Sequence, residues 1–127
     1  KVDFTPQADT FMGVASAALV ALARRVDAAA EPAWREMRNT NWSRMESVGD
    51  QSSYVGELVR RVEASAGETL ALLQKPGYAR AFADKVVEGV VQAYVGTIVA
   101  CRPISEVGAE QVCLLTFYLP PKFANSC

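Results

Sequence analysis

The amino-acid sequence predicts an all-α protein, built as an antiparallel helical bundle. Apolar residues recur at three- and four-residue spacings through four long stretches, which is the period of one face of a helix. The segments between these stretches contain proline, glycine or residues that cap helices. Short connections of this kind place successive helices side by side in opposite directions. We therefore expect one helical domain, or a fragment of a larger one, with a lead-in at residues 1–7, a bundle at 8–119 and a tail at 120–127.

The first long helix is expected from Ala8 onward, with Pro6 at or near its start. Pro32 either kinks this helix or starts a short new one, because proline removes a backbone donor. The predicted apolar face of this helix holds Phe11, Ala15, Ala18, Leu22 and Val26.

A corner between two helices is predicted at residues 41–55, the stretch that breaks the helical period. Trp42 supplies a large apolar anchor, for which core packing is the favoured role. Gly49 can take a positive φ that most residues resist. The N-cap of the next helix is left open among Asp50, Ser52 and Ser53.

A second helix follows the corner, and a third runs from about Tyr78 to Ala100. The third helix is rich in valine, but its length and its lack of internal turn signals favour helix over strand. Its two apolar stripes predict contacts with more than one neighbour. The apolar stripe of the second helix is Val55, Leu58, Val59, Val62, Ala66, Leu70 and Leu73. The first stripe of the third helix is Phe82, Val86, Val90, Ala93, Thr97 and Cys101. Its second stripe is Val87, Val91, Val95 and Ile98.

A last helix is predicted after Ser105, which is a candidate N-cap. The preceding Arg102-Pro103 pair ends the third helix, because the residue before proline avoids the helical region. Pro120-Pro121 is expected to end the last helix. Within the third helix, Gly89 and Gly96 are expected to permit close packing.

Composition narrows the class of function. The chain has 127 residues, of which 50% are hydrophobic, and a formal net charge of -1, which argues against a strong electrostatic hold on nucleic acid. Histidine is absent, which removes the commonest general base and a common metal ligand. The odd number of cysteines, Cys101, Cys113 and Cys127, predicts reduced thiols in a cytosolic protein. We expect Cys101 and Cys113 to pack as small apolar side chains.

The chain begins at Lys1 rather than at methionine, so we expect a fragment, a processed product or a trimmed form. No signal or transit peptide is recognisable. The longest apolar run, residues 86–100, is interrupted by polar residues and glycines, so membrane association is expected to be peripheral or through partners.

No catalytic constellation, cofactor site or metal site is expected, and we predict that the chain is not an enzyme. Glu106 and Glu110 stand four residues apart, but a solvated helix face explains them better than a carboxylate pair does. Cys113 has no histidine to activate it. Trp34 is left open between core and interface. Weak candidates for a partner surface, against the alternative of ordinary exposed charges, are Arg24, Arg25, Arg60 and Arg61.

Two motifs resemble those of one family. The run Val-Gly-Asp-Gln-Ser-Ser-Tyr-Val (residues 48–55) and the run Cys-Arg-Pro-Ile-Ser-Glu-Val-Gly-Ala-Glu-Gln (residues 101–111) look like signatures of the vacuolar protein sorting subunit fifty-three family. The Asp-Ala-Ala-Ala-Glu-Pro run at residues 27–32, before Trp42, is similar to a further family pattern. The residues that carry the resemblance are Trp42, Val48, Gly49, Asp50, Gln51, Ser52, Tyr54, Cys101, Pro103, Ile104, Ser105, Gly108, Ala109, Glu110 and Gln111.

The resemblance covers residues 9–114 and implies a piece from the carboxy-terminal half of the family's protein. The family is a shared subunit of the GARP and EARP vesicle-tethering complexes, and it belongs to the elongated helical rods of the CATCHR group. It implies retrograde transport from endosomes to the trans-Golgi network, endosomal recycling, and a place on the cytosolic face of the Golgi apparatus and endosome membranes. The implied partners are the other complex subunits, together with SNAREs and small GTPases, and no nucleic acid.

The resemblance is lost from about Leu115, where a truncated gene model or a natural short form would explain the ending. We expect the missing helices to leave an apolar face of the third helix uncovered, and the isolated piece to be only marginally stable. The alternative function is a helical adaptor or small-GTPase-regulatory module unrelated to tethering. A third alternative, a four-helix-bundle enzyme with a buried metal, is opposed by the absence of histidine.

Overall fold

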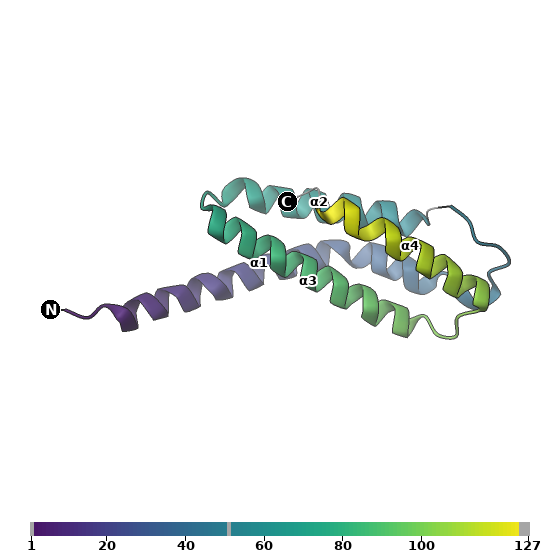
Figure 1. The fold of residues 1–127 in the computed structure, drawn as a ribbon, viewed down its shortest axis with the longest axis horizontal. Helices are drawn as coiled ribbons and strands as arrows, with labels where there is room; N and C mark the ends of the chain where they lie inside the picture. Colours follow the sequence, from purple (N-terminus) through teal and green to yellow (C-terminus); the bar gives the residue numbers. More distant parts are fainter. Residues whose placement is uncertain (1, 51, 125–127) are drawn as a thin grey trace.

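The computed structural model describes residues 2–50 and 52–124, and its fold is a bundle of helices (Figure 1). Four α-helices follow one another: α1 (Thr5–Asn39), α2 (Ser53–Leu72), α3 (Pro76–Ala100) and α4 (Glu106–Ala124). A single 3-10 turn, η1 (Trp42–Arg44), lies between α1 and α2. Successive helices run in opposite directions, and the described residues contain no β-strand, so the predicted all-α antiparallel bundle is confirmed.

Helix α1 is the centre of the bundle, because both α2 and α3 pack on it. Helix α4 packs on α2 and on η1. Its reach to α3 includes the Tyr94 hydroxyl, which lies 3.3 Å from the carbonyl oxygen of Val112 and 3.0 Å from the hydroxyl of Thr116. The core contains large side chains from α1, η1, α2 and α3, including Trp34, Met37, Trp42, Tyr54, Leu58 and Phe82.

The amino-terminal part of α1 projects beyond the bundle (Figure 1). Helix α1 has 35 residues and is therefore about 52 Å long, whereas α2 with 20 residues is about 30 Å long. The buried residues of α1 begin only at Leu19. The predicted apolar face is therefore wrong in its first part, since Phe11 is 74% exposed and Ala18 is exposed, while Val26 is fully buried.

The structure contradicts the predicted end of the last helix at Pro120-Pro121 and, for Pro32, the alternative of a new short helix. Helix α1 runs through Pro32 and does not restart there. Pro32 is exposed, so solvent is available to the carbonyl that loses its N–H partner. Helix α4 continues past Pro120-Pro121 to Ala124. The fixed φ of proline, about −65°, lies in the helical region, so the missing N–H groups need not end the helix.

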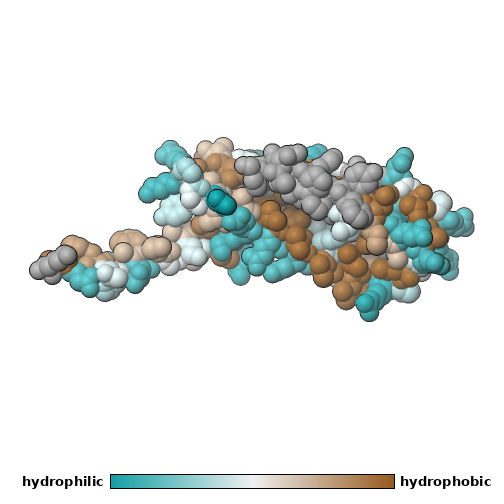
Figure 2. Space-filling view, in the orientation of Figure 1, coloured by the Kyte–Doolittle hydropathy of each residue, from teal (hydrophilic) through white to brown (hydrophobic). Residues whose placement is uncertain are grey.

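The apolar stripe of α2 and the first stripe of α3 are in the core as predicted, with Leu58, Val62, Phe82 and Val86 all buried. The second stripe of α3 is different. Val87 is 41% exposed, and Val91 and Val95 are each 55% exposed. Helix α3 contacts both α1 and α2, so the predicted contact with more than one neighbour is confirmed, but these three valines stay exposed. The surface view shows hydrophobic side chains along the course of α3 (Figure 2).

Candidate functional site

The loop between α1 and α2 and the loop between α3 and α4 meet at the same end of the bundle (Figure 1). The two sequence motifs lie in and beside these loops. We call the contact between them the clasp, formed by Trp42, Gly49, Asp50, Ser105, Gly108 and Gln111.

Trp42 anchors the first loop. Its side chain is 1% exposed, and its indole Nε1 donates a hydrogen bond of 2.8 Å to the carbonyl oxygen of Met37 at the end of α1. Its ring meets the ring of Tyr54 edge to face, with centroids 6.3 Å apart. The predicted core role of Trp42 is confirmed. Trp34, left open by the sequence, is also buried.

Ser105 ties the second loop to the first. Its backbone N–H and its hydroxyl both donate to the carbonyl oxygen of Trp42, at 3.1 and 2.9 Å. The same hydroxyl oxygen accepts a hydrogen bond of 3.1 Å from the backbone N–H of Gly108. Gly108 is the third residue of α4 and Ser105 is the residue just before the helix, so this bond has the geometry of an N-cap. The predicted N-cap is confirmed, and it also carries a contact between loops.

Gly108 is a glycine because the first loop passes directly over it. A Cβ atom at this position would lie 2.5 Å from the carbonyl oxygen of Trp42 and 3.0 Å from a methyl carbon of Ile104. The close atom of Trp42 is backbone, held by Ser105, so it cannot swing away. The absence of a side chain therefore lets the two loops touch.

Gln111 closes the clasp from α4. Its side chain is 2% exposed, its Oε1 accepts from the backbone N–H of Gly49 at 2.8 Å, and its Nε2 donates to the carbonyl oxygen of Asp50 at 3.0 Å. One amide side chain thus pairs with a backbone donor and a backbone acceptor of a loop that has no regular structure. This pairing joins the two motifs across more than 60 positions of sequence.

One prediction for the first loop is wrong, and one choice that the sequence left open is decided. Gly49 does not have a positive φ, and neither does any other described residue. Of the three candidate N-caps of α2, Ser52 occupies the position, although its side chain makes no capping hydrogen bond, and Asp50 does not cap the helix. Tertiary contact with Gln111 holds the loop in place of local cap chemistry. Gln51 lies outside the described residues.

The remaining motif residues divide between core and surface. Tyr54 is 1% exposed, its hydroxyl has no hydrogen-bond partner among the described residues, and burial raises its pKa above the usual range. Ile104 is partly buried. Apart from Gly49 and Asp50 of the clasp, the exposed residues that carry the resemblance are Val48, Pro103, Ala109 and Glu110.

The thiols differ. Cys101 is buried, lies 3.7 Å from the carbonyl oxygen of Met37, and has its pKa raised by burial, which agrees with the predicted packing role. Cys113 is exposed, so its predicted packing role is wrong. Cys127 lies outside the described residues.

The glycines of α3 also divide. A Cβ at Gly89 would lie 2.7 Å from Oδ1 of Asp27, which confirms close packing there. No neighbouring atom lies within 4 Å of a Cβ at Gly96, so the same prediction is wrong at that position.

The candidate arginines lie on two helices. On α2, Arg60 and Arg61 both bind Glu57, at 2.8 and 2.6 Å. Hydrogen bonds from Arg60 and then Arg61 lower the pKa of Glu57 to about 2. Arg24 and Arg25 are exposed on α1. These four residues remain a predicted partner surface. The structure adds that both arginines of α2 form ion pairs with the carboxylate of Glu57.

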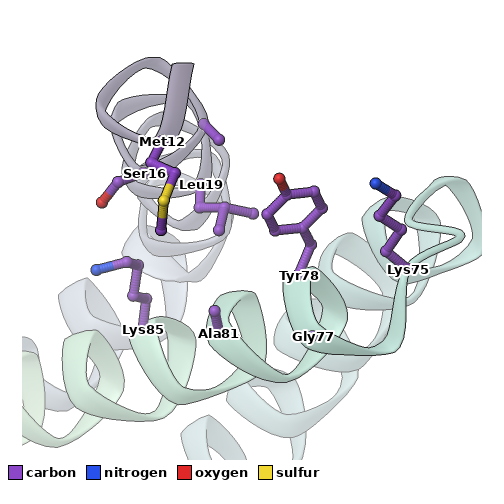
Figure 3. Close-up of a pocket in the computed structure, with 9 residues that line it drawn as sticks. Met12, Ser16, Leu19, Lys75, Gly77, Tyr78, Ala81 and Lys85 are labelled. Atoms are coloured by element: carbon purple, nitrogen blue, oxygen red, sulfur yellow. The ribbon is translucent and has the colours of Figure 1, made fainter. Parts of the chain in front are cut away.

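A notch, which sequence patterns did not reveal, opens where the projecting part of α1 leaves the start of α3 (Figure 3). It has a volume of about 550 Å³. Met12, Ser16 and Leu19 of α1 face Tyr78, Ala81 and Lys85 of α3 across it. Ala15, Lys75 and Gly77 complete the lining. The sequence signal for this notch is weak, because only the unequal lengths of the helices create it.

Within the part of the chain that the structure describes, no three potential ligands among His, Cys, Asp and Glu come together as a metal site. Glu106 and Glu110 are both exposed, in keeping with a solvated face. No helix in residues 2–50 and 52–124 combines the length and apolarity that a membrane span requires.

Comparison with known proteins gives the family. No protein-family model matches the chain, and no solved structure matches it. It is similar to vacuolar protein sorting-associated protein 53 A of Arabidopsis thaliana, with 33% identity over 115 residues that cover 91% of this chain and 14% of that protein. It is also similar to the vacuolar protein sorting-associated protein 53 homolog of Caenorhabditis elegans, with 26% identity over 119 residues that cover 93% of this chain and 15% of that protein. The chain thus belongs to the vacuolar protein sorting-associated protein 53 family and spans a small part of the length of these relatives.

Proposed function

We propose that this chain is a non-catalytic segment of a subunit in a multisubunit vesicle-tethering complex. The complex acts in retrograde transport from endosomes to the trans-Golgi network as GARP, and in endosomal recycling as EARP. The observation that carries the proposal is the similarity to two proteins named for vacuolar protein sorting, which extends over more than nine-tenths of the chain. The proposed location is the cytosolic face of trans-Golgi and endosomal membranes, with peripheral attachment through partners.

The structure supports a scaffold role in a specific way. The two family motifs build a clasp whose hydrogen bonds join loop to loop and loop to helix. Both polar atoms of the Gln111 side chain form hydrogen bonds that hold the end of the bundle together, as expected of a structural element. The uncovered apolar stripe of α3 and the projecting α1 suit a segment of a longer helical rod, as in the CATCHR group.

The proposed partners are the other subunits of the GARP and EARP complexes, with SNAREs and small GTPases at the distal end, and no nucleic acid. We place this segment in the carboxy-terminal half, as a distal leg that projects from the assembled complex. This position predicts that damage to the segment spares assembly of the complex and impairs vesicle capture.

The first test is affinity purification of the complete parent protein from its own cells, with mass spectrometry of the proteins that accompany it. We expect the other sorting subunits in comparable amounts. Their absence from a preparation with intact, soluble bait would refute the proposal. A small GTPase recovered without them would favour the adaptor or GTPase-regulatory alternative.

The second test separates a distal leg from an assembly hub. Gly108→Val in the complete protein places a branched side chain against the carbonyl oxygen of Trp42 and disrupts the clasp. We expect the same subunits to be recovered while endosome-to-Golgi cargo return fails. Loss of the subunits themselves would show that this segment belongs to the assembly region. Gly96→Val, at an exposed position with no neighbouring atom within 4 Å, is the matched control.

A further inference from the structure

The notch between α1 and α3 is continuous with an uncovered helix. No residue of α1 before Leu19 is buried, and Phe11, Met12 and Val14 are 74%, 69% and 64% exposed. Met12 lies both on this projecting part and in the lining of the notch. The exposed apolar surface therefore begins on the projecting part of α1 and ends in a hollow.

The dimensions suit a helix. Residues 5–18 of α1 extend about 21 Å, so a partner helix of about 14 residues matches their length. An extended peptide would need an unpaired sheet edge to bind by its backbone, and the described residues include no strand. A second helix can instead lay an apolar face along α1 and insert side chains into the notch.

The charged residues around the notch indicate which kind of partner helix it can bind. Lys75 and Lys85 lie at opposite ends of the opening (Figure 3), and no acidic side chain lines it. Neither lysine forms an ion pair with a described residue, although the Lys75 ammonium lies 5.8 Å from the centre of the Tyr78 ring. The acidic residues Asp27 and Glu88 line a separate hollow farther along α1 and α3, which Lys85 also borders. A ligand in the notch therefore meets an apolar floor and a basic rim.

We propose that the notch and the projecting part of α1 bind an acidic amphipathic helix of a partner protein. The apolar side chains of that helix, three and four residues apart, cover Met12, Leu19 and Tyr78. Its flanking carboxylates lie beside the ammonium groups of Lys75 and Lys85. This assignment concerns a surface of the chain and stands apart from the identity of the tethering complex.

Site-specific photo-cross-linking in the complete parent protein, in its own cells, tests the occupant. The photoreactive residue p-benzoylphenylalanine replaces Ser16, which lines the notch, and in a control replaces Ala17, which is exposed and outside the lining. We expect position 16 to cross-link to a segment of another protein with apolar residues at helical spacing and flanking Asp or Glu. Cross-links only to lipid, to a second copy or to a basic segment, or no cross-link beyond that at position 17, overturn the proposal.

Binding of a synthetic peptide with the cross-linked sequence then tests the chemistry. Reversal of both rim charges, K75E with K85E, is expected to weaken binding about tenfold, because two partly exposed ion pairs become repulsive contacts. Arg80→Glu, on the same helix but outside the lining, is the matched control and leaves affinity unchanged. A peptide with lysine in place of its acidic residues regains affinity for the reversed variant. Equal affinity of wild type and reversed variant overturns the charge assignment.

A second variant guards against loss of folding. Met12 is 69% exposed, so Met12→Glu leaves the core intact while it places a carboxylate on the apolar floor. We expect weaker peptide binding with an unchanged circular dichroism spectrum. Failure of the notch proposal and failure of the proposed function give different results. Recovery of the sorting subunits without a cross-link at position 16 refutes the notch proposal alone. A cross-link at position 16 to an acidic helix, without recovery of the sorting subunits, refutes the tethering role alone.

Discussion

Gln111 shows how much of this fold depends on single side chains. It is 2% exposed, and its amide forms both hydrogen bonds of the clasp with the backbone of Gly49 and Asp50. A buried polar group stabilises a fold only while its partners are present. The residue therefore specifies which loop lies against α4.

Replacing Gln111 by leucine is expected to lower the free energy of unfolding by about 2 kcal/mol, because two hydrogen bonds are lost and two backbone groups lose their partner. Urea denaturation measures the change. Gln111→Glu retains an acceptor for Gly49 but buries a carboxylate against the carbonyl oxygen of Asp50, so it should destabilise at least as much as leucine. Gln92→Leu on the exposed side of α3 is the control, and a similar loss there would remove the argument for the clasp.

Replacement of Tyr54 is expected to raise the free energy of unfolding, whereas replacement of Gln111 lowers it. Its hydroxyl is buried without a hydrogen-bond partner among the described residues. Tyr54→Phe removes this group and keeps the ring against Trp42, so we expect a gain in the free energy of unfolding of about 1 kcal/mol. Thermal denaturation at neutral pH checks this, with Tyr78→Phe at the exposed start of α3 as control. A loss of stability would mean that the hydroxyl is hydrogen-bonded in solution.

At the scale of the element, the same substitution has different consequences along the helices. Alanine favours helix over glycine by about 1 kcal/mol at an unconstrained position. Gly96 has open space around it, whereas Gly108 lies under the carbonyl oxygen of Trp42. Helix propensity therefore determines the effect of a substitution at Gly96, and tertiary contact determines it at Gly108.

We expect Gly96→Ala to raise the free energy of unfolding by up to about 1 kcal/mol. Gly108→Ala should lower it by about 1–3 kcal/mol, because its Cβ would lie 2.5 Å from the carbonyl oxygen of Trp42. Chemical denaturation of the two variants in parallel is the measurement. Changes of the same sign in both would show that helix propensity alone governs these positions.

The ion pairs of α2 predict a dependence on pH. The pKa of Glu57 is lowered from 4.5 to about 2, chiefly by hydrogen bonds from Arg60 and then Arg61. A carboxyl with a depressed pKa in the folded state stabilises the fold above its unfolded pKa. This contribution is therefore complete above about pH 4.5 and is lost as the pH falls towards about 2.

The comparison of wild type with Glu57→Gln isolates this effect. The difference in melting temperature should be present at pH 6 and should shrink progressively between pH 4.5 and pH 2. Added salt should reduce it as well, because the arginines are partly exposed. A difference that is constant across this range would show that Glu57 contributes nothing through its charge.

At the scale of the whole molecule, the bundle has an incomplete surface. Val87, Val91, Val95 and Val99 are exposed along α3, and hydrophobic surface follows this helix in Figure 2. An exposed apolar surface of this kind favours association with another helix. The same surface supports the expectation that the isolated chain is only marginally stable.

The isolated chain should therefore show thermal unfolding that depends on its concentration. Val91→Lys with Val95→Lys should abolish that dependence and change the free energy of unfolding by no more than about 0.5 kcal/mol, since both side chains are 55% exposed. Scanning calorimetry at several concentrations, together with light scattering, provides the measurement. Gln92→Lys controls for the added charge. A cooperative melt of the wild-type chain that is independent of concentration would contradict marginal stability.

Local patterns in the sequence are sufficient to predict the helices, their order and the family. The periodicity of Val55, Leu58 and Val62 or of Phe82, Val86 and Val90 is local information, because a helix places residues three or four apart on one face. Ser105 was recognisable as an N-cap for the same reason, since its partner Gly108 is three residues away. The two motifs were recognisable as patterns without knowledge of their contacts.

The contacts that the motifs make, and the apolar residues that remain exposed, depend on how the helices pack in three dimensions. Gln111 meets Gly49 across 62 positions, and no local spacing predicts that pair. Phe11 and Val91 have the same helical spacing as buried residues, but the neighbouring helices do not reach the first and do not cover the second. Burial depends on the lengths and placement of other helices, so the clasp and the notch emerge only when the chain is folded.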